Sequence, residues 1–290
     1  MTETVHYRYA TVQGQRLFYR EAGPADAPVV VLLHGFPTSS FMFRNLIPQL
    51  DGYRVIAPDH LGFGFSDAPA VQEFDYTFDA LAELTAGLLE QLNVHRYAVY
   101  AQDYGAPIAW RLALRDPDAI SAVISQNGNA YDEGFVADGW QGIWAYQREQ
   151  TPQNEAALRQ VLTLDAVRWQ YVTGVADESV VSPDTWRHDY AHLSRPGNAE
   201  VQLKLFLDYA NNPPMYPAFH EWLRSRQVPV LAVWGKYDPF FGPDGARAFE
   251  RDTANAEVHL FEGGHFLLES AGDEVAALIR KFLSRHAPAA

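Results

Sequence analysis

Short runs of β-branched residues alternate with helical patterns in the first third of the chain, and this alternation limits the possible folds more than any other feature. The run at residues 28–33, PVVVLL, has no polar position, as expected of a strand buried on both faces. Residues 77–92 place apolar side chains on one helical face, with Thr77 or Asp75 as the cap. The pattern predicts strands joined by crossover helices in a mostly parallel sheet. The expected strands are 16–21, 28–33, 53–57, 97–101 and 119–125, with helices at 77–92 and 106–114.

The character of the sequence changes at Tyr131. Several tryptophans and tyrosines then appear in segments of helical periodicity, as far as about Arg226. We interpret residues 131–226 as a mostly helical cap, inserted into a core formed by residues 1–130 and 227–290. In the second part of the core we expect strands at 228–234 and 256–261, and helices at 245–252 and 273–283.

Bulk properties narrow the classes of partner. The chain has 290 residues, 48% of them hydrophobic, which is enough for one sizeable core with an inserted subdomain. Its net charge of −14 would repel a polyanion, so nucleic acid is not an expected partner. Residues 1–10 lack the apolar segment of a signal peptide, and no uncharged apolar run is long enough to cross a bilayer. We therefore expect a soluble cytoplasmic protein that does not act at a membrane. The sequence does not decide between a monomer and a homodimer.

Asp103 stands where a predicted strand passes directly into a predicted helix. The small residues Ala101 and Gly105 flank it at the spacing of a nucleophile elbow, a sharp turn that projects one side chain above the sheet. Asp103 occupies the position that Ser usually holds there. An Asp at the end of a strand is also a common helix N-cap, so the position alone leaves both readings open.

A second turn, at His34-Gly35-Phe36-Pro37, follows the buried strand at residues 28–33. The backbone N–H groups of Phe36 and Tyr104 could face one pocket there and form an oxyanion hole. The alternative is an ordinary Gly-Pro turn, with His34 as a structural hydrogen-bonding residue.

Two further candidates follow predicted strands near the end of the chain. His265 lies on a loop after Gly263 and Gly264, and Asp238 follows the strand at 228–234. Catalytic groups in parallel sheets gather at the carboxyl ends of the strands. We therefore interpret His265 as a base and Asp238 as the carboxylate that orients its imidazole. The alternative for Asp238 is a turn-forming Asp-Pro pair.

Five stretches together resemble a known family, namely HGFPTSSFMFRNLIPQL, APDHLGFGFSDAP, AQDYGAPIAWRLAL, VLAVWGKYDPF and GGHFLLE. They are similar to the epoxide hydrolase and haloalkane dehalogenase branch of the α/β-hydrolase superfamily, over residues 9–123 and 228–283 and much more loosely in the cap. The resemblance implies the α/β-hydrolase fold and a two-step reaction without a metal or other cofactor. In that reaction Asp103 would form an alkyl ester with a small apolar organic substrate, and water activated by His265 would hydrolyse the ester.

The leaving group separates the two activities. Haloalkane dehalogenases usually carry Trp after the nucleophile and often Asn between the Gly and Pro of the turn, as halide donors, where this chain has Tyr104 and Phe36. Epoxide hydrolases use cap tyrosines as acids, and the stretch around Tyr209 resembles the segment that carries one of them. The resemblance therefore favours an epoxide hydrolase giving vicinal diols, with a dehalogenase as the alternative. For the second tyrosine we favour Tyr146, with Tyr171 as its competitor.

The expected substrate pocket is apolar. The cap tryptophans Trp140, Trp144 and Trp169 are interpreted as its lining, and the turn is expected to contribute His34 and Pro37.

Two hypotheses from other classes were weighed. His188 and His192 have the i, i+4 spacing of a zinc pair, but no third ligand is evident. The other hypothesis is a binding protein that kept the fold but lost catalysis. The complete Asp/Asp/His set argues against it, because a binding protein does not need all three residues.

Overall fold

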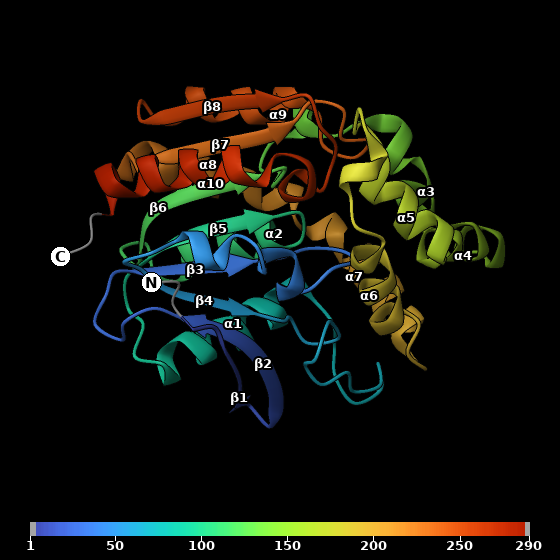
Figure 1. The fold of residues 1–290 in the computed structure, drawn as a ribbon. Helices are drawn as coiled ribbons and strands as arrows, with labels where there is room; N and C mark the ends of the chain where they lie inside the picture. Colours follow the sequence, from blue (N-terminus) through green and yellow to red (C-terminus); the bar gives the residue numbers. More distant parts are fainter. Residues whose placement is uncertain (1–3, 288–290) are drawn as a thin grey trace.

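The computed structural model describes residues 4–287 and contains an eight-stranded sheet in the order β1-β2-β4-β3-β5-β6-β7-β8 (Figure 1). β1 pairs antiparallel with β2, and β2 with β4, while every other neighbouring pair is parallel. This arrangement confirms the predicted mostly parallel sheet flanked by helices. The strands are β1 (His6–Val12), β2 (Gln15–Ala22), β3 (Val29–Leu33), β4 (Arg54–Pro58), β5 (Tyr97–Gln102), β6 (Ile120–Gln126), β7 (Val230–Gly235) and β8 (Ala256–Phe261).

The central strands are buried on both faces. Along β3, Val31 and Leu33 join one apolar cluster and Val30 and Leu32 join a second. The first cluster contains residues of α1 (Phe78–Gln91), α2 (Gly105–Arg115) and α8 (Tyr216–Arg226), and the second contains residues of α10 (Leu267–His286). The sheet is therefore a middle layer between two helical layers, as the unbroken apolar strand sequences predict.

Local signals set several helix boundaries. The Thr77 side chain accepts a hydrogen bond from the backbone N–H of Ala80 at 3.1 Å, so Thr77 rather than Asp75 caps α1. The helix expected at 245–252 is α9 (Pro243–Ala248) followed by a 3₁₀ turn, and the helix expected at 273–283 starts earlier, at Leu267. β1 was not predicted, because most of its side chains are exposed and it lacks an apolar face.

Five further helices lie between β6 and β7, at the end of the sheet toward which the parallel strands point (Figure 1). The boundaries of the cap stay a prediction. Helix α8 lies inside the range assigned to the cap, but it packs on α2: the ring of Phe219 stacks on Trp110, with centroids 4.1 Å apart. Within residues 4–287, no helix has the length and apolar character needed to cross a membrane. The five helices are α3 (Ala137–Arg148), α4 (Pro152–Arg159), α5 (Leu164–Val172), α6 (Pro183–Leu193) and α7 (Asn198–Asp208).

Candidate active site

Asp103 occupies a strained turn between β5 and α2. Its φ of 48° lies in the left-handed region, which non-glycine residues rarely adopt. The turn is held close to the loop after β3: a Cβ atom added at Gly35 would lie 2.3 Å from the Cβ of Asp103, and one added at Gly105 would lie 2.2 Å from the carbonyl oxygen of Leu33. These approaches explain why glycine is needed at both positions, and they hold Asp103 in place.

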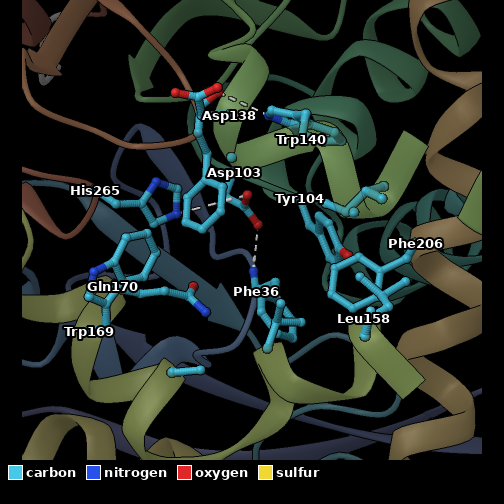
Figure 2. Close-up of a pocket in the computed structure, with 17 residues that line it drawn as sticks. Phe36, Asp103, Tyr104, Asp138, Trp140, Leu158, Trp169, Gln170, Phe206 and His265 are labelled. Carbon is cyan, nitrogen blue, oxygen red and sulfur yellow. Dashed lines mark hydrogen bonds and ion pairs between the residues drawn. The ribbon is translucent and has the colours of Figure 1, made fainter. Parts of the chain in front are cut away.

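The carboxylate of Asp103 faces backbone donors. Oδ1 accepts a hydrogen bond from the N–H of Phe36 at 2.6 Å (Figure 2). Burial raises the pKa of Asp103 to about 6, although His265 and the backbone N–H groups of Phe36 and Tyr104 act in the opposite direction. Above that pH the carboxylate is ionised, and the N–H of Phe36 already lies where an oxyanion hole needs a donor.

His265 and Asp238 form a fully buried pair. Nδ1 of His265 lies 2.7 Å from Oδ2 of Asp238. Asp238 also accepts hydrogen bonds from the Asn127 side chain at 2.8 Å and from the N–H of Phe240 at 2.7 Å, so both of its oxygens are paired. Burial lowers the pKa of His265, but the charge and hydrogen bond of Asp238, together with the charge of Asp103, outweigh this effect and leave it raised. The pair fixes the imidazole with its Nδ1 proton toward Asp238.

The other ring nitrogen of His265 faces Asp103 and Gln102. Nε2 lies 3.9 Å from Oδ2 of Asp103, too far for a direct hydrogen bond, and 2.9 Å from Nε2 of Gln102. Sequence reasoning missed Gln102 and Asn127. The only signal for them was position, since each lies at or just after the end of a strand neighbouring the site.

A cavity of about 310 Å³ opens over Asp103 and His265. Its lining is mostly apolar and aromatic, and residues of α3, α4, α5 and α7 contribute to it. The polar side chains in the lining besides Asp103 and His265 include Asp138 and Gln170. The apolar members include Phe36, Ile143, Leu158 and Phe206.

The structure brings only some of the predicted pocket residues to this cavity. Trp140 and Trp169 line it, and the indole of Trp140 donates to the carbonyl oxygen of Phe240 at 2.9 Å. His34, Pro37, Trp144, Tyr146 and Tyr209 are not in the lining.

His34 is buried against the loop that carries His60. Its Nε2 accepts from the backbone N–H of His60 at 3.0 Å, and burial lowers its pKa well below the ordinary value. The imidazole is therefore neutral and holds two loops together.

The tyrosines differ in their surroundings. Tyr104 lines the cavity, and Tyr209 packs beside it with ring centroids 6.0 Å apart. Within the described residues neither hydroxyl has a hydrogen-bond partner. Burial raises the pKa of both phenols. The charge of Asp103 raises the pKa of Tyr104 further, whereas for Tyr209 the neighbouring Tyr216 has a larger effect than Asp103. By contrast, the hydroxyl of Tyr171 donates to Asp189 and is already engaged.

The histidine pair on α6 does not form part of a larger ligand set. In the part of the chain that the structure describes, no group of three or more His, Asp or Glu side chains is arranged to hold a metal ion. The ring of His188 stacks on Phe41, with centroids 4.1 Å apart.

Comparisons with known proteins agree with this architecture. A family model described as alpha/beta hydrolase fold matches residues 28–271. The chain is 41% identical to an uncharacterized hydrolase of Saccharomyces cerevisiae over 94% of both proteins. It is 31% identical to a haloalkane dehalogenase of Mycobacterium marinum, over 91% of this chain and 87% of the relative. The solved structure of the epoxide hydrolase CorEH is similar with a TM-score of 0.80 at 22% identity, over 97% of this chain and 99% of that one.

The structural similarity shows that the fold is shared, and the sequence matches show which family the chain belongs to. A nucleophile-elbow turn, a His–Asp pair at the carboxyl end of the sheet and a family match over most of the chain lead to one conclusion: the chain belongs to the α/β-hydrolase family, and it is related in sequence to haloalkane dehalogenases.

Proposed function

We propose that this protein is an epoxide hydrolase that opens small apolar epoxides to vicinal diols, with Asp103 as the nucleophile. One observation carries the proposal: a carboxylate, not a hydroxyl, stands at the elbow, with one oxygen held by the N–H of Phe36. A carboxylate is ionised without a base, so it can attack an sp³ carbon while His265 stays free for a later step.

In the first step the attacking atom is Oδ2 of Asp103, since Oδ1 is the oxygen that accepts the hydrogen bond from Phe36. Oδ2 of Asp103 attacks one epoxide carbon, the C–O bond of the ring breaks, and the oxygen leaves with the electron pair. Oδ1 becomes the carbonyl oxygen of the resulting ester and keeps its hydrogen bond from Phe36. The departing alkoxide takes a proton from a phenol. Tyr209 is the proposed acid, and it lies just outside the cavity lining, beside the lining residue Tyr104.

The second step consumes water. Nε2 of His265 removes a proton from water, and the hydroxide attacks the carboxyl carbon of the ester. The N–H groups of Phe36 and Tyr104 stabilise the tetrahedral oxyanion. The bond from that carbon to Oδ2 then breaks, so the former Oδ2 leaves as the second hydroxyl of the diol and an oxygen from water completes the restored Asp103 carboxylate. Of the two water protons, one passes through His265 to that hydroxyl and the other returns to the phenolate. Asp238 stabilises the imidazolium that forms in this step.

The phenols support an epoxide over a halide. An alkoxide is a strong base and requires a proton donor, whereas a halide requires only weak hydrogen-bond donors. Tyr104 and Tyr209 have buried hydroxyls without described partners and lie close enough to Asp103 for its charge to raise their pKa. The apolar lining and a volume of about 310 Å³ suit a small organic molecule.

A haloalkane dehalogenase is the second candidate. The 31% identity to a protein of that name over most of both chains favours it. At the two positions where the resemblance expects halide donors, however, this chain carries Phe36 and Tyr104.

A parallel substrate panel tests the proposal. The purified protein is incubated with terminal and aryl epoxides and with chloro- and bromoalkanes of similar size, and diol and halide release are measured together. Diol formation without halide release is the expected result. Bromide release without diol would reverse the order of the two candidates. No turnover and no covalent adduct on Asp103 with any substrate would support a non-catalytic binding protein.

A further inference from the structure

Gln170 places an unsatisfied amide in the wall of the cavity. It lies on α5, it is 2% exposed, and it belongs to the cavity lining. Within the described residues its Oε1 has no hydrogen-bond partner. In Figure 2 its amide end points toward the centre of the pocket rather than into the helix packing.

A buried amide without a protein partner is unfavourable, because it loses its hydrogen bonds to bulk water on folding. The adjacent residue on α5 shows the usual outcome, since the Tyr171 hydroxyl donates to Asp189. A Leu or Met at position 170 would fill the same space without this cost. Oε1 has almost no accessible surface, so a bound molecule meets the amide through Nε2, or through Oε1 after the amide has rotated about its terminal bond.

The position of Gln170 separates it from the proposed acid. Figure 2 shows Gln170 and Trp169 on the side of His265, with Tyr104, Phe206 and Leu158 across the cavity. A neutral amide cannot protonate an alkoxide, so the leaving oxygen belongs with the phenols. Gln170 thus faces another part of the bound molecule.

The surrounding charges limit what that part can be. Asp103 and Asp138 line the cavity, and no Lys or Arg does so among the residues described, so an anionic substituent would be repelled. The two ends of a Gln amide exchange by rotation and offer a donor or an acceptor. A hydroxyl both donates and accepts, and it can therefore pair with either end.

We propose that Gln170 binds a hydroxyl group of the substrate, so that the preferred substrates are epoxides with a neutral hydroxyl-bearing substituent next to the ring. This inference rests on the proposed epoxide chemistry for its turnover test, but the binding site for the hydroxyl can be tested without it. Gln170 acts here as a specificity-determining residue.

The turnover test compares two substrates that differ in one group. 3-Phenylglycidol carries the hydroxyl, and 2-ethyl-3-phenyloxirane has a methyl group in its place. In Gln170→Met, kcat/KM for phenylglycidol should fall by about tenfold or more, while kcat/KM for the ethyl compound changes little. Leu158→Met, an apolar change in the same lining, is the matched control and should keep the parent's preference for the hydroxyl substrate.

Two outcomes would overturn the inference. An equal loss on both substrates would assign the amide to the leaving oxygen or to the hydrolytic water, and an unchanged preference would leave it without a role in recognition. Thermal unfolding separates a folding defect from these results, because removing an unsatisfied buried amide should leave the unfolding temperature unchanged or higher.

A binding test keeps the inference separate from the epoxide proposal. Line broadening in ¹⁹F NMR measures the affinity of 4-fluorobenzyl alcohol and 4-fluorotoluene, neither of which can react as an epoxide. We expect the alcohol to bind the parent about fivefold or more tightly than the toluene, and Gln170→Met to abolish the difference. If this holds while no epoxide is hydrolysed, the proposed activity is wrong and the hydroxyl site stands. Equal binding of both compounds to the parent would refute the hydroxyl site itself.

Discussion

The side-chain amide of Gln102 donates a hydrogen bond to Nε2 of His265 at 2.9 Å, on the side of the ring opposite Asp238. Because Nδ1 directs its proton to Asp238, the lone pair of the neutral imidazole is on Nε2, where the Gln102 N–H meets it. The interaction favours the neutral ring, which is the form that a base in the hydrolytic step requires. Gln102 is thus a candidate positioning residue directly before Asp103 in the chain.

Asp103→Asn should abolish turnover and raise stability at neutral pH. Asn tolerates the left-handed backbone at φ 48° and its carbonyl can accept from Phe36, but it is not a nucleophile of comparable strength. We expect at least about a thousandfold loss of kcat/KM. A loss of less than about tenfold, near 1.4 kcal/mol, would contradict the nucleophile assignment.

The stability effect follows from the raised pKa. The folded-state pKa of about 6 exceeds the ordinary 3.8, so the protonated form is favoured by folding and this contribution is lost as the pH rises through 6. The ionised carboxylate then costs about 3 kcal/mol at pH 7.5. Thermal unfolding should show the Asn variant more stable than the parent at pH 7.5 and closely similar near pH 3.5.

His265→Gln should stop the reaction after the first step. Nε2 and Oδ2 are 3.9 Å apart, without a direct hydrogen bond. Loss of His265 raises the pKa of Asp103 further, so the variant is assayed well above pH 6, where alkylation should proceed and hydrolysis should stall. Intact-protein mass spectrometry should detect an adduct of substrate mass, mapped to Asp103 by peptide analysis. Asp103→Asn serves as the control without an adduct. A clean parent mass after incubation with a good substrate would point to different chemistry.

The two steps should have different pH dependences. Alkylation needs the Asp103 carboxylate and should increase through a midpoint near pH 6. Hydrolysis needs neutral His265, and ester formation removes the Asp103 charge that helps to raise the pKa of His265. The pKa of His265 should therefore be lower in the adduct than in the free enzyme. Histidine NMR of the free protein and single-turnover decay of the adduct measure the two values, and an adduct midpoint above the free value would refute this coupling.

Gln102→Leu should shift the pH profile of the second step alone. Without the donor to Nε2, the neutral imidazole is less favoured and the pKa of His265 rises, by about 0.5 to 1 unit for an ordinary hydrogen bond. The midpoint of adduct decay should move upward while that of alkylation stays in place. A uniform loss of rate with both midpoints unchanged would indicate that Gln102 only supports the local packing.

Tyr209→Phe should slow epoxide opening by about one to three orders of magnitude in kcat/KM, because it removes the proposed proton donor to the alkoxide. Any residual halide release should change little. Tyr104→Phe tests the other phenol without a described partner, and Tyr146→Phe is the comparison at the second tyrosine expected from the sequence. A double Tyr209/Tyr146 change should match the single Tyr209 change, because both tyrosines lie outside the lining but Tyr209 packs beside the lining residue Tyr104. Parent-like epoxide hydrolysis in Tyr209→Phe and Tyr104→Phe alike would exclude the phenols as acids.

The order of strands and helices could be predicted because it depends on local periodicity. Apolar runs such as residues 28–33 and the capped helix after Thr77 carry their own signal, and both appear in the structure. β1 carries no such signal, since it is an exposed edge strand that exists through its antiparallel pairing with β2. Its pairing partner, rather than its own pattern, makes it a strand.

The convergence of Asp103, Asp238 and His265 could be predicted for a similar reason. Each follows a strand of a parallel sheet, and the carboxyl ends of such strands share one edge. Sequence order and strand position were therefore enough to bring these three side chains together, and the structure pairs His265 with Asp238 at 2.7 Å.

The hydrogen-bond partners and the pocket lining were decided by tertiary structure alone. Trp140 and Trp169 face the cavity while Tyr146 does not, and Tyr171 is bound to Asp189, although all four are aromatic residues in helices of mixed polarity. In such helices the sequence pattern does not single out one buried face, so packing between segments distant in the chain sets which side chain meets the substrate. The same holds for Gln102 and Gln170, whose amides acquire a role only from what the fold places beside them.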